Sequence, residues 1–492
     1  MEKMTDSLDS GGSIAECESK ISSIDAQIAK LQSLRAIERN KLGKLKYHST
    51  PLHVLPLEML SEIFKFFVVA ADNDLADNEI VVVPHAALLS EVCHYWRQVA
   101  LGLPSLWSEL TIGVVERPEE KHIQGIRAWL ARSSPLPLSI YLFWDLEDHI
   151  ESESAVINEI VGVKSRLKSL RIGGMVGNGR QPPTMAIGAL MGDPLPALQT
   201  LRLDDSIELE WAADAADARI DLSAVAPHLR TVVFPEDYLN LFDNVPWPQF
   251  KDLKFFTAID DTFDILRQSR NIEQLEIRTI QWGYGEDTSL AYGQPTLALP
   301  VLRHFSLELE FSTTDIIGEI LPLFHCLACP ALTSFRMHFE LDSEALWNHQ
   351  EFALFQSRSP HIQHLELSNA MLDSADLTSM LRFSPALKSL ILASCNECID
   401  DAFLQALEYR ESDADAEPHA ARLEVLSWIG LRHKFHDSVL EGMLRSRCLT
   451  VTPPSKIARL KKVHIDCGGG HVMVDAAFAA QMEACIEEFV IL

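Results

Sequence analysis

The sequence predicts a mixed α+β and α/β fold, in which an N-terminal helix and a helical module precede an irregular solenoid built on a parallel sheet. Three observations lead to this prediction. Residues 14–46 follow a heptad pattern, residues 51–110 follow amphipathic helical spacing, and a short apolar motif recurs beyond Pro135. Because 492 residues exceed the usual size of one compact domain, we expect several domains or a repeat array.

The first predicted element is an amphipathic or coiled-coil helix over residues 14–46, preceded by a disordered segment at residues 1–13. In the heptad register Arg35 and Glu38 fall on the a and d positions, so a two-stranded seam would be interrupted in its middle. The helix therefore either lies against the next domain, partly free, or self-associates. Its apolar heptad residues are Ile14, Ile21, Ile24, Ile28, Leu31, Leu42 and Leu45.

The second predicted element is a helical module over residues 51–110. Pro56 suits the first turn of a helix, and apolar residues spaced along one face follow it. The polar stretch from Ala71 to Glu79 predicts a loop, and helical spacing resumes past Pro84 as a second helix. Pro104-Ser105-Leu106-Trp107 closes the module. One side of the second helix carries Leu89, Val92, Cys93, Trp96 and Val99.

Two stretches of this module resemble the F-box, a small three-helix domain. They are Leu55-Pro56-x-Glu58-x-Leu60-x-x-Ile63-Phe64 and Val92-Cys93-x-x-Trp96-Arg97-x-Val99-Ala100. The segments 104–107, 129–133 and 137–140 are similar to those of the F-box-like proteins that are numerous in mushroom-forming fungi. The resemblance implies that the module binds the Skp-type adaptor of cullin-based ubiquitin ligases. The residues expected to form the adaptor-binding site are Leu55, Pro56, Leu60, Ile63, Phe64, Val92 and Trp96.

The third predicted element is a repeat array over residues 111–492, ending in a C-terminal cap. In each copy an apolar residue is followed three and five positions later by two more, and most neighbouring copies lie roughly 25 to 37 residues apart, around or somewhat beyond the range of leucine-rich repeats. The copies are Leu167-Leu170-Ile172, Leu198-Leu201-Leu203, Leu229-Val232-Phe234, Ile272-Leu275-Ile277, Leu302-Phe305-Leu307, Leu332-Phe335-Met337, Ile362-Leu365-Leu367, Leu387-Leu390-Leu392, Leu423-Leu426-Trp428 and Leu460-Val463-Ile465.

Each copy is expected to form one short parallel strand, because this spacing turns alternate side chains toward a core while a helix or turn returns on the other side. The segment from Leu387 to Leu404 looks like the cysteine-containing class of leucine-rich repeat, with Cys395 as a buried turn residue. A plain α/β layered domain is the alternative. Residues between the apolar positions should face outward and form a target-binding surface with a local basic or hydrogen-bonding patch, the alternative being an ordinary solvated sheet face. They are Arg202, Glu276, Arg278, His304, Glu308, Arg336, His338, His364 and Glu366.

No catalytic or cofactor-binding motif is recognisable in the sequence. The pairs Cys326/Cys329 and Cys395/Cys398 are separated too widely for a usual zinc site, so we expect buried core thiols and no metal. Glycines between residues 173 and 179 match no phosphate-binding loop and are expected to form a flexible loop. His433 and His436 lack a nucleophile motif or metal pattern, and solvation at the surface accounts for them.

Composition excludes two classes of partner. Lys and Arg number 42 against 70 Asp and Glu, and a net charge of −28 repels phosphate backbones and anionic lipid, so neither nucleic acid nor a membrane is expected as a partner. The N-terminus lacks the apolar stretch of a secretory signal, and no run of about 18 apolar residues follows. We expect an intracellular protein, cytoplasmic or nuclear.

These observations and the resemblance together predict a non-catalytic receptor subunit of a Skp-cullin-F-box ubiquitin ligase. The module would bind the adaptor, and through it a cullin, while the repeats would bind an unknown protein target. The alternative is a non-degradative scaffold or interaction protein that uses the same F-box and repeats. An enzyme is disfavoured because the sequence shows no motif for one.

Overall fold

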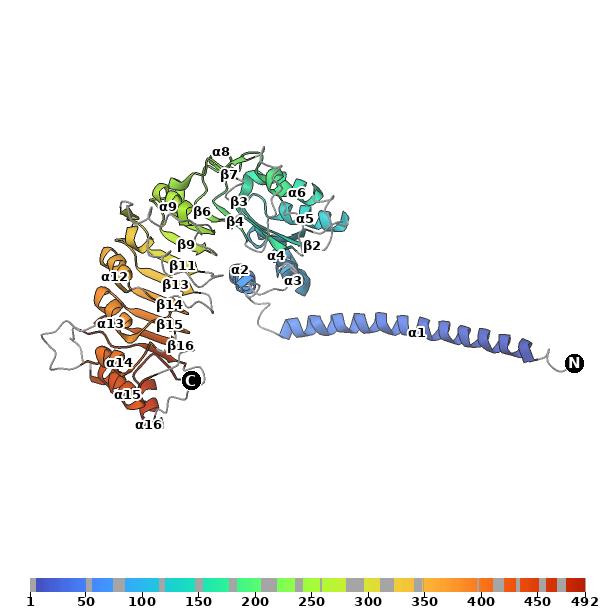
Figure 1. The fold of residues 1–492 in the computed structure, drawn as a ribbon. Coiled ribbons are helices and arrows are strands. Elements are labelled where there is room, and N and C mark those ends of the chain that lie inside the picture. Colours follow the sequence, from blue (N-terminus) through green and yellow to red (C-terminus); the bar gives the residue numbers. More distant parts are fainter. Residues whose placement is uncertain are drawn as a thin grey trace. The chain divides into compact units, whose positions relative to one another are not determined.

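The protein is described from a computed structural model, shown in Figure 1. The chain divides into two compact units, Met1–Leu106 and Trp107–Leu492. The structure describes residues 6–49, 55–73, 85–114, 120–146, 154–176, 184–204, 219–234, 242–256, 259–279, 296–309, 323–339, 347, 349–395, 398–409, 420–430, 434–450, 457–466 and 475–491.

The first unit begins with one long helix, α1 (Asp6–Ser49). It starts eight residues before the predicted Ile14, so much of the segment expected to be disordered is helical. The described side chains from Glu16 to Lys46 are all exposed.

Three further helices complete the first unit: α2 (Leu57–Asn73), α3 (His85–Val92) and α4 (His94–Leu101). The predicted second helix is broken at Cys93, which has an extended backbone and caps α4 by accepting a bond from the Trp96 N–H at 3.4 Å. The helix α2 also continues through Asn73, into the segment predicted as a loop. The rest of that segment, residues 74–79, lies outside the described residues.

The second unit is a solenoid of fourteen strands in one sheet, and every neighbouring pair is parallel. The strands follow one another in chain order, so each repeat contributes one strand beside the last (Figure 1). They are β1 (Glu109–Val114), β2 (Leu138–Leu146), β3 (Leu167–Val176), β4 (Thr200–Leu203), β6 (Thr231–Phe234), β8 (Asp252–Phe256), β9 (Gln274–Thr279), β11 (His304–Leu309), β13 (Ser334–Phe339), β14 (His364–Ser368), β15 (Ser389–Ala393), β16 (Val425–Ile429), β17 (Lys462–Ile465) and β18 (Glu488–Ile491).

The connections return along one side of this sheet as helices and short extended pieces (Figure 1). Two pairs of short parallel strands lie there, β5 (Ile220–Asp221) with β7 (Phe242–Asp243) and β10 (Leu297–Ala298) with β12 (Leu327–Ala328). The helices are α5 (Glu120–Arg132), α6 (Ser154–Val161), α7 (Thr184–Met191), α8 (Leu222–Val225), α9 (Ile259–Gln268), α12 (His349–Arg358), α13 (Ser374–Phe383), α14 (Asp401–Leu407), α15 (Asp437–Arg445) and α16 (Ala476–Glu483). Shorter turns are η3 (Pro104–Trp107), η4 (Lys164–Arg166), η7 (Trp247–Gln249) and η9 (Ser446–Thr450).

The core lies between the sheet and these connections. All ten predicted copies of the apolar motif form strands, and none of their three apolar side chains is more than 2% exposed. Three further copies were not predicted: Trp107-Leu110-Ile112 at β1, Phe250-Leu253-Phe255 at β8 and Ile486-Phe489-Ile491 at β18. All three follow the same spacing, so the motif itself could have revealed them. The fold is therefore an irregular leucine-rich-repeat type of α/β solenoid.

The array begins slightly earlier than the predicted residue 111. Trp107, expected to close the helical module, belongs instead to the second unit. Its ring packs edge-on against Trp129, with centroids 4.6 Å apart, and the Arg132 guanidinium lies 4.6 Å from its centroid. Trp107 therefore covers the solenoid core at its first repeat. Its buried ring packs on apolar side chains of α5, which have no preceding repeat to cover them.

Candidate functional site

The helical module has its own small core. Leu60 and Phe64, on one face of α2, are fully buried, and the Phe64 ring lies 4.8 Å from that of Trp96 on α4. Two of the seven residues predicted to bind the adaptor therefore hold the helices together and cannot touch a partner. Leu55 and Trp96 are half-buried, whereas Pro56, Ile63 and Val92 are exposed.

A second apolar stripe on α2 faces solvent. Met59, Ile63 and Phe66 follow one another at helical spacing, and Phe66 is 76% exposed. Such a stripe on a module with its own core is a candidate interaction surface. The sequence reading found Ile63 but missed Met59 and Phe66, although their i, i+4, i+7 spacing signals a second face. Val92 at the end of α3 adds a further exposed apolar side chain.

The array offers a broader surface, formed by strand side chains that point away from the core and here called the open face. The alternation of burial along the strands places the nine predicted target-binding residues there, and all of them are exposed or half-buried. Whether they bind a target stays a prediction.

The predicted basic patch on the open face is instead a set of balanced ion pairs. Strand register sets Arg336 directly beside Glu366, and their side chains meet at 2.9 Å. Arg278 pairs with Glu308 in the same way. These four residues, with Leu309, His338 and Ser368, line a shallow depression of about 450 Å³.

Two further histidines lie close to the residues that line this depression. His304 and His364 are the first residues of their strands. Strand register sets both beside Ser334, which is two residues before Arg336 on β13. Burial, Lys388 and His304 lower the pKa of His364, so its ring is neutral at pH 7. The open face is therefore suited to hydrogen bonding and to charge-matched contacts, and it is not a general anion-binding surface.

A further polar cluster on the open face was not predicted. Arg171 on β3 stacks over the Tyr141 ring at 4.3 Å and pairs with Asp204 at 2.9 Å, while the Tyr141 hydroxyl donates to Asp204 at 3.2 Å. Burial, and then Asp204, raise the pKa of Tyr141 to about 12. Gly173 makes room for this contact, because a Cβ there would lie 2.3 Å from the Asp204 carboxylate.

The prediction of a flexible loop is wrong for Gly173 and Gly174, because both lie within β3. The small size of Gly173, and not conformational freedom, is what the sheet uses at this point. Gly177 and Gly179 lie outside the described residues. No signal in the sequence identified the cluster, because Tyr141 and Asp204 are far apart along the chain.

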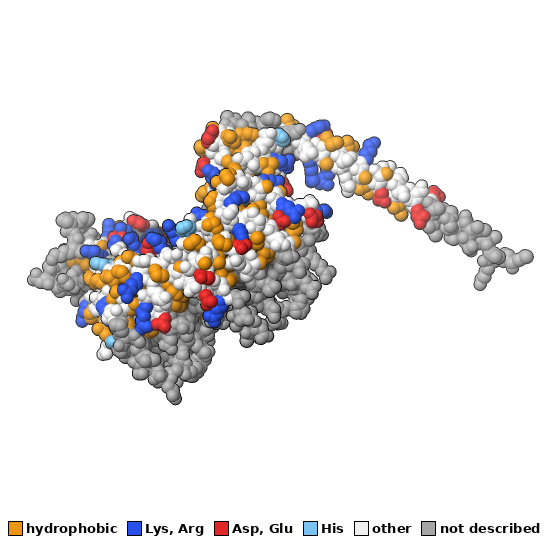
Figure 2. Space-filling model, turned by 90° about the horizontal axis from the view of Figure 1, so that it is seen from above, with side chains coloured by type: hydrophobic (Ala, Val, Ile, Leu, Met, Phe, Trp, Pro, Cys, Tyr) orange, Lys and Arg blue, Asp and Glu red, His pale blue; other side chains and the backbone are white. Residues whose placement is uncertain are grey.

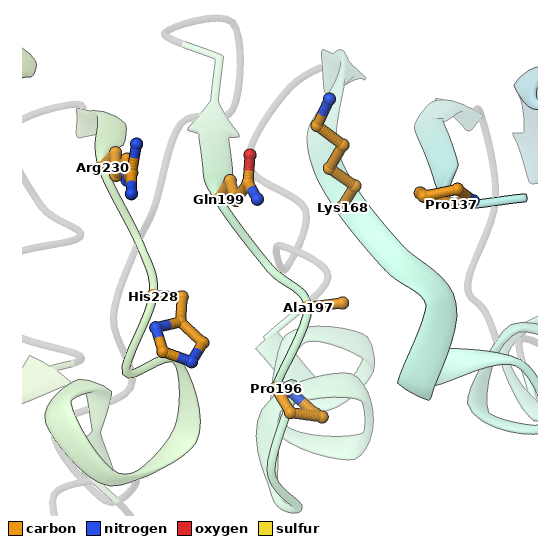
Figure 3. Close-up of a pocket in the computed structure, with 7 residues that line it drawn as sticks. All are labelled: Pro137, Lys168, Pro196, Ala197, Gln199, His228 and Arg230. Carbon is orange, nitrogen blue, oxygen red and sulfur yellow. The ribbon is translucent and has the colours of Figure 1, made fainter.

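A smaller depression of about 340 Å³ lies where three strands begin (Figure 3). Lys168, Gln199 and Arg230 each directly precede or begin a strand, and backbone hydrogen bonds join them in sequence. Further along this edge, two cations pair with carboxylates, Lys251 with Glu273 and Lys461 with Glu424. The depression is lined by Pro137, Lys168, Pro196, Ala197, Gln199, His228 and Arg230.

The four cysteines of the Cys326/Cys329 and Cys395/Cys398 sequence pairs are free thiols buried in the core. Burial raises the pKa of Cys329 to about 12 and that of Cys395 to about 11, and it also raises those of Cys326 and Cys398. Their sulfurs are therefore protonated thiols. In the described part of the chain, no group of three or more His, Cys, Asp or Glu side chains could hold a metal ion.

Of the two candidate histidines, His433 and His436, His436 lies in the described part of the chain. His436 donates its backbone N–H to Asp401 at 2.7 Å, and its ring Nδ1 lies 2.6 Å from the same carboxylate. These bonds hold the pKa of Asp401 below its ordinary value. The contact joins α14 to α15 in neighbouring repeats, so it is structural. His433 lies outside the described residues.

These features define the class of the protein as a helical module joined to a leucine-rich-repeat type solenoid, a fold suited to protein interaction. No family model matches the chain, and no curated protein matches it. Among the helices of the described ranges, none is both long enough and apolar enough to cross a membrane.

Two solved structures are similar in part. One is the TLR13–ssRNA13 complex, with a TM-score of 0.37 and 13% identity over 74% of this chain; the match spans 50% of that chain. The other is the leucine-rich repeat-containing protein LegL7 from Legionella pneumophila, with a TM-score of 0.31 and 11% identity, covering 68% of this chain and 97% of that one.

Proposed function

We propose that this protein is a receptor subunit of a cullin-based ubiquitin ligase, whose helical module binds a Skp-type adaptor and whose array binds a protein target. The observation that carries the proposal is the exposed stripe Met59-Ile63-Phe66 on a module that already has its own core. The stripe overlaps the F-box-like motif that begins at Leu55, because Met59 and Ile63 lie within that motif. A helical partner can bury such a stripe in a groove.

The array supports the second half of the proposal. A sheet of fourteen parallel strands presents a long row of side chains, and such extended surfaces suit protein partners. The chain itself supplies proximity: a bound target near a ubiquitin carrier reacts at a raised effective concentration, and the chemistry belongs to other subunits.

Adaptor capture by the full chain tests this proposal. Replacing Ile63 and Phe66 by alanine removes exposed apolar area without opening the module core, so we expect the double variant to keep its circular dichroism spectrum. Capture of a purified Skp-type adaptor should fall about tenfold or more, since apolar hot spots contribute about 2 kcal/mol or more each.

The matched control is Leu354→Ala with Met371→Ala. These two array residues are 45% and 40% exposed and remove comparable apolar area outside the module. Adaptor capture should match that of the unmodified chain. If the Ile63→Ala/Phe66→Ala variant captures the adaptor as well as this control does, the stripe is not the adaptor site.

A further inference from the structure

The long helix α1 exposes apolar side chains along most of its length. Leu31 is 65% exposed and Leu45 is 69% exposed, and Figure 2 shows hydrophobic side chains interspersed with charged ones along this helix. Helices gain most of their stability from burial of an apolar face against another element. The repeated a and d positions point to a second helix as the occupant.

Two charged residues interrupt the apolar seam and decide which second helix fits. Arg35 occupies an a position and Glu38 a d position. In a parallel two-stranded coil each faces its own copy, which brings two arginines and two glutamates together in the seam. In an antiparallel coil a positions face d positions, so Arg35 of one copy can lie against Glu38 of the other.

We propose that two copies of this chain associate through α1 as an antiparallel coiled coil, with Arg35 of each copy paired with Glu38 of the other. This register also sets Leu31 against Leu42 and Ile28 against Leu45 of the second copy, so apolar layers flank both ion pairs. A charged pair enclosed in this way fixes register and orientation, because any other alignment leaves both charges unpaired.

The contact that Glu38 makes within its own helix competes only weakly with the proposed pairing to Arg35 of the second copy. Glu38 meets Lys41 at 2.6 Å, but both side chains are more than 60% exposed, and such surface pairs contribute little. The two orientations also differ at Cys17, which is exposed and lies at a d position. A parallel coil would set the two Cys17 thiols face to face, whereas the proposed antiparallel register leaves Cys17 outside the overlap of the two helices.

The proposal is independent of adaptor binding and concerns assembly. A dimer would present two arrays to one partner, and binding at two sites strengthens capture of a repeated or dimeric target.

Sedimentation equilibrium of the full chain tests the pairing. We expect a concentration-dependent dimer whose dissociation constant rises about tenfold or more in Glu38→Arg, which sets two cations against each other. The double variant Arg35→Glu/Glu38→Arg restores the opposite charges and should return the constant to within about threefold of the original. In a parallel coil the double swap would also return one layer of like cations and one of like anions, so this variant tests the charge pairing, and disulfide trapping decides the orientation.

Glu16→Arg is the matched control, because it makes the same charge change and removes a comparable surface pair, Glu16 with Lys20, outside the proposed overlap. It should leave the dissociation constant unchanged. A chain that stays monomeric, or equal weakening by Glu16→Arg, would overturn the proposal.

Disulfide trapping tests the register. In a Cys17→Ser background, Leu31→Cys with Leu42→Cys should give covalent dimers on oxidation, whereas Leu31→Cys alone should not. Within one helix these positions are about 16 Å apart, too far for an internal bond. Dimers from Leu31→Cys alone would show a parallel coil and sink the antiparallel one.

Discussion

At the scale of single residues, Arg447 is the clearest case of a charge used to hold the fold. It is 1% exposed, and its terminal nitrogen donates to the carbonyls of Ala420 and Leu423 at 3.1 and 3.2 Å. Burial lowers its pKa to about 10, so it remains protonated at neutral pH. It ties the turn before β16 to the helix end after it.

We therefore expect Arg447→Ala to lower the free energy of unfolding by about 3 kcal/mol, since it leaves a cavity and removes hydrogen bonds from buried carbonyls. Arg447→Met fills most of the volume and should lose less, which separates the two effects. Thermal unfolding of both variants measures this, with the exposed Arg422→Ala as control. Equal stability of Arg447→Ala and Arg422→Ala would contradict the assigned role.

At the scale of elements, neighbouring strands share their outward charges as pairs. Lys254 on β8 meets Glu276 on β9 at 2.5 Å, and the pairs on β9–β11 and β13–β14 follow the same pattern. Surface pairs of this kind add at most about 1 kcal/mol to stability. Their consequence is specificity, because the order of charges along the open face is fixed by strand register.

If this order of charges recognises the target, Arg336→Glu with His364→Glu should remove co-purifying proteins from the full chain and leave adaptor capture intact. The swap Arg336→Glu/Glu366→Arg keeps an ion pair between the same two strands but exchanges the positions of the two charges. It should therefore keep the stability of the unmodified chain while it changes the order of charges that a target would contact. Affinity purification with quantitative mass spectrometry compares the variants. Unchanged co-purifying proteins in both would place recognition elsewhere on the array.

At the scale of the whole molecule, the excess of acidic residues governs which large partners can approach. A net charge of −28 repels polyanions over distances set by salt screening. We expect neither double-stranded DNA nor vesicles rich in phosphatidylserine to retain the chain at low salt, measured by mobility shift and by vesicle co-sedimentation. Retention that weakens as salt rises would show that a local basic site, such as the one at Lys168 and Arg230, outweighs the net charge.

The sequence alone determined where the strands of the array lie. The three-and-five spacing of apolar residues located ten strands correctly, since a strand with one buried face must alternate its side chains. It also located the helical module. The break at Cys93 was missed because a capping residue and a helix interior residue both fit the same apolar spacing.

Only the tertiary structure decided which side chains meet. Arg336 is paired because the register of β13 and β14 sets it beside Glu366, and no spacing within either strand reveals that. The cluster of Tyr141, Arg171 and Asp204 likewise needs three strands and a glycine to assemble. In the module, Leu60 and Ile63 are both apolar on α2, yet only the position of α4 places Leu60 in the core and leaves Ile63 exposed. Local pattern fixes the period of an element, whereas contacts between elements depend on register and on three-dimensional neighbours.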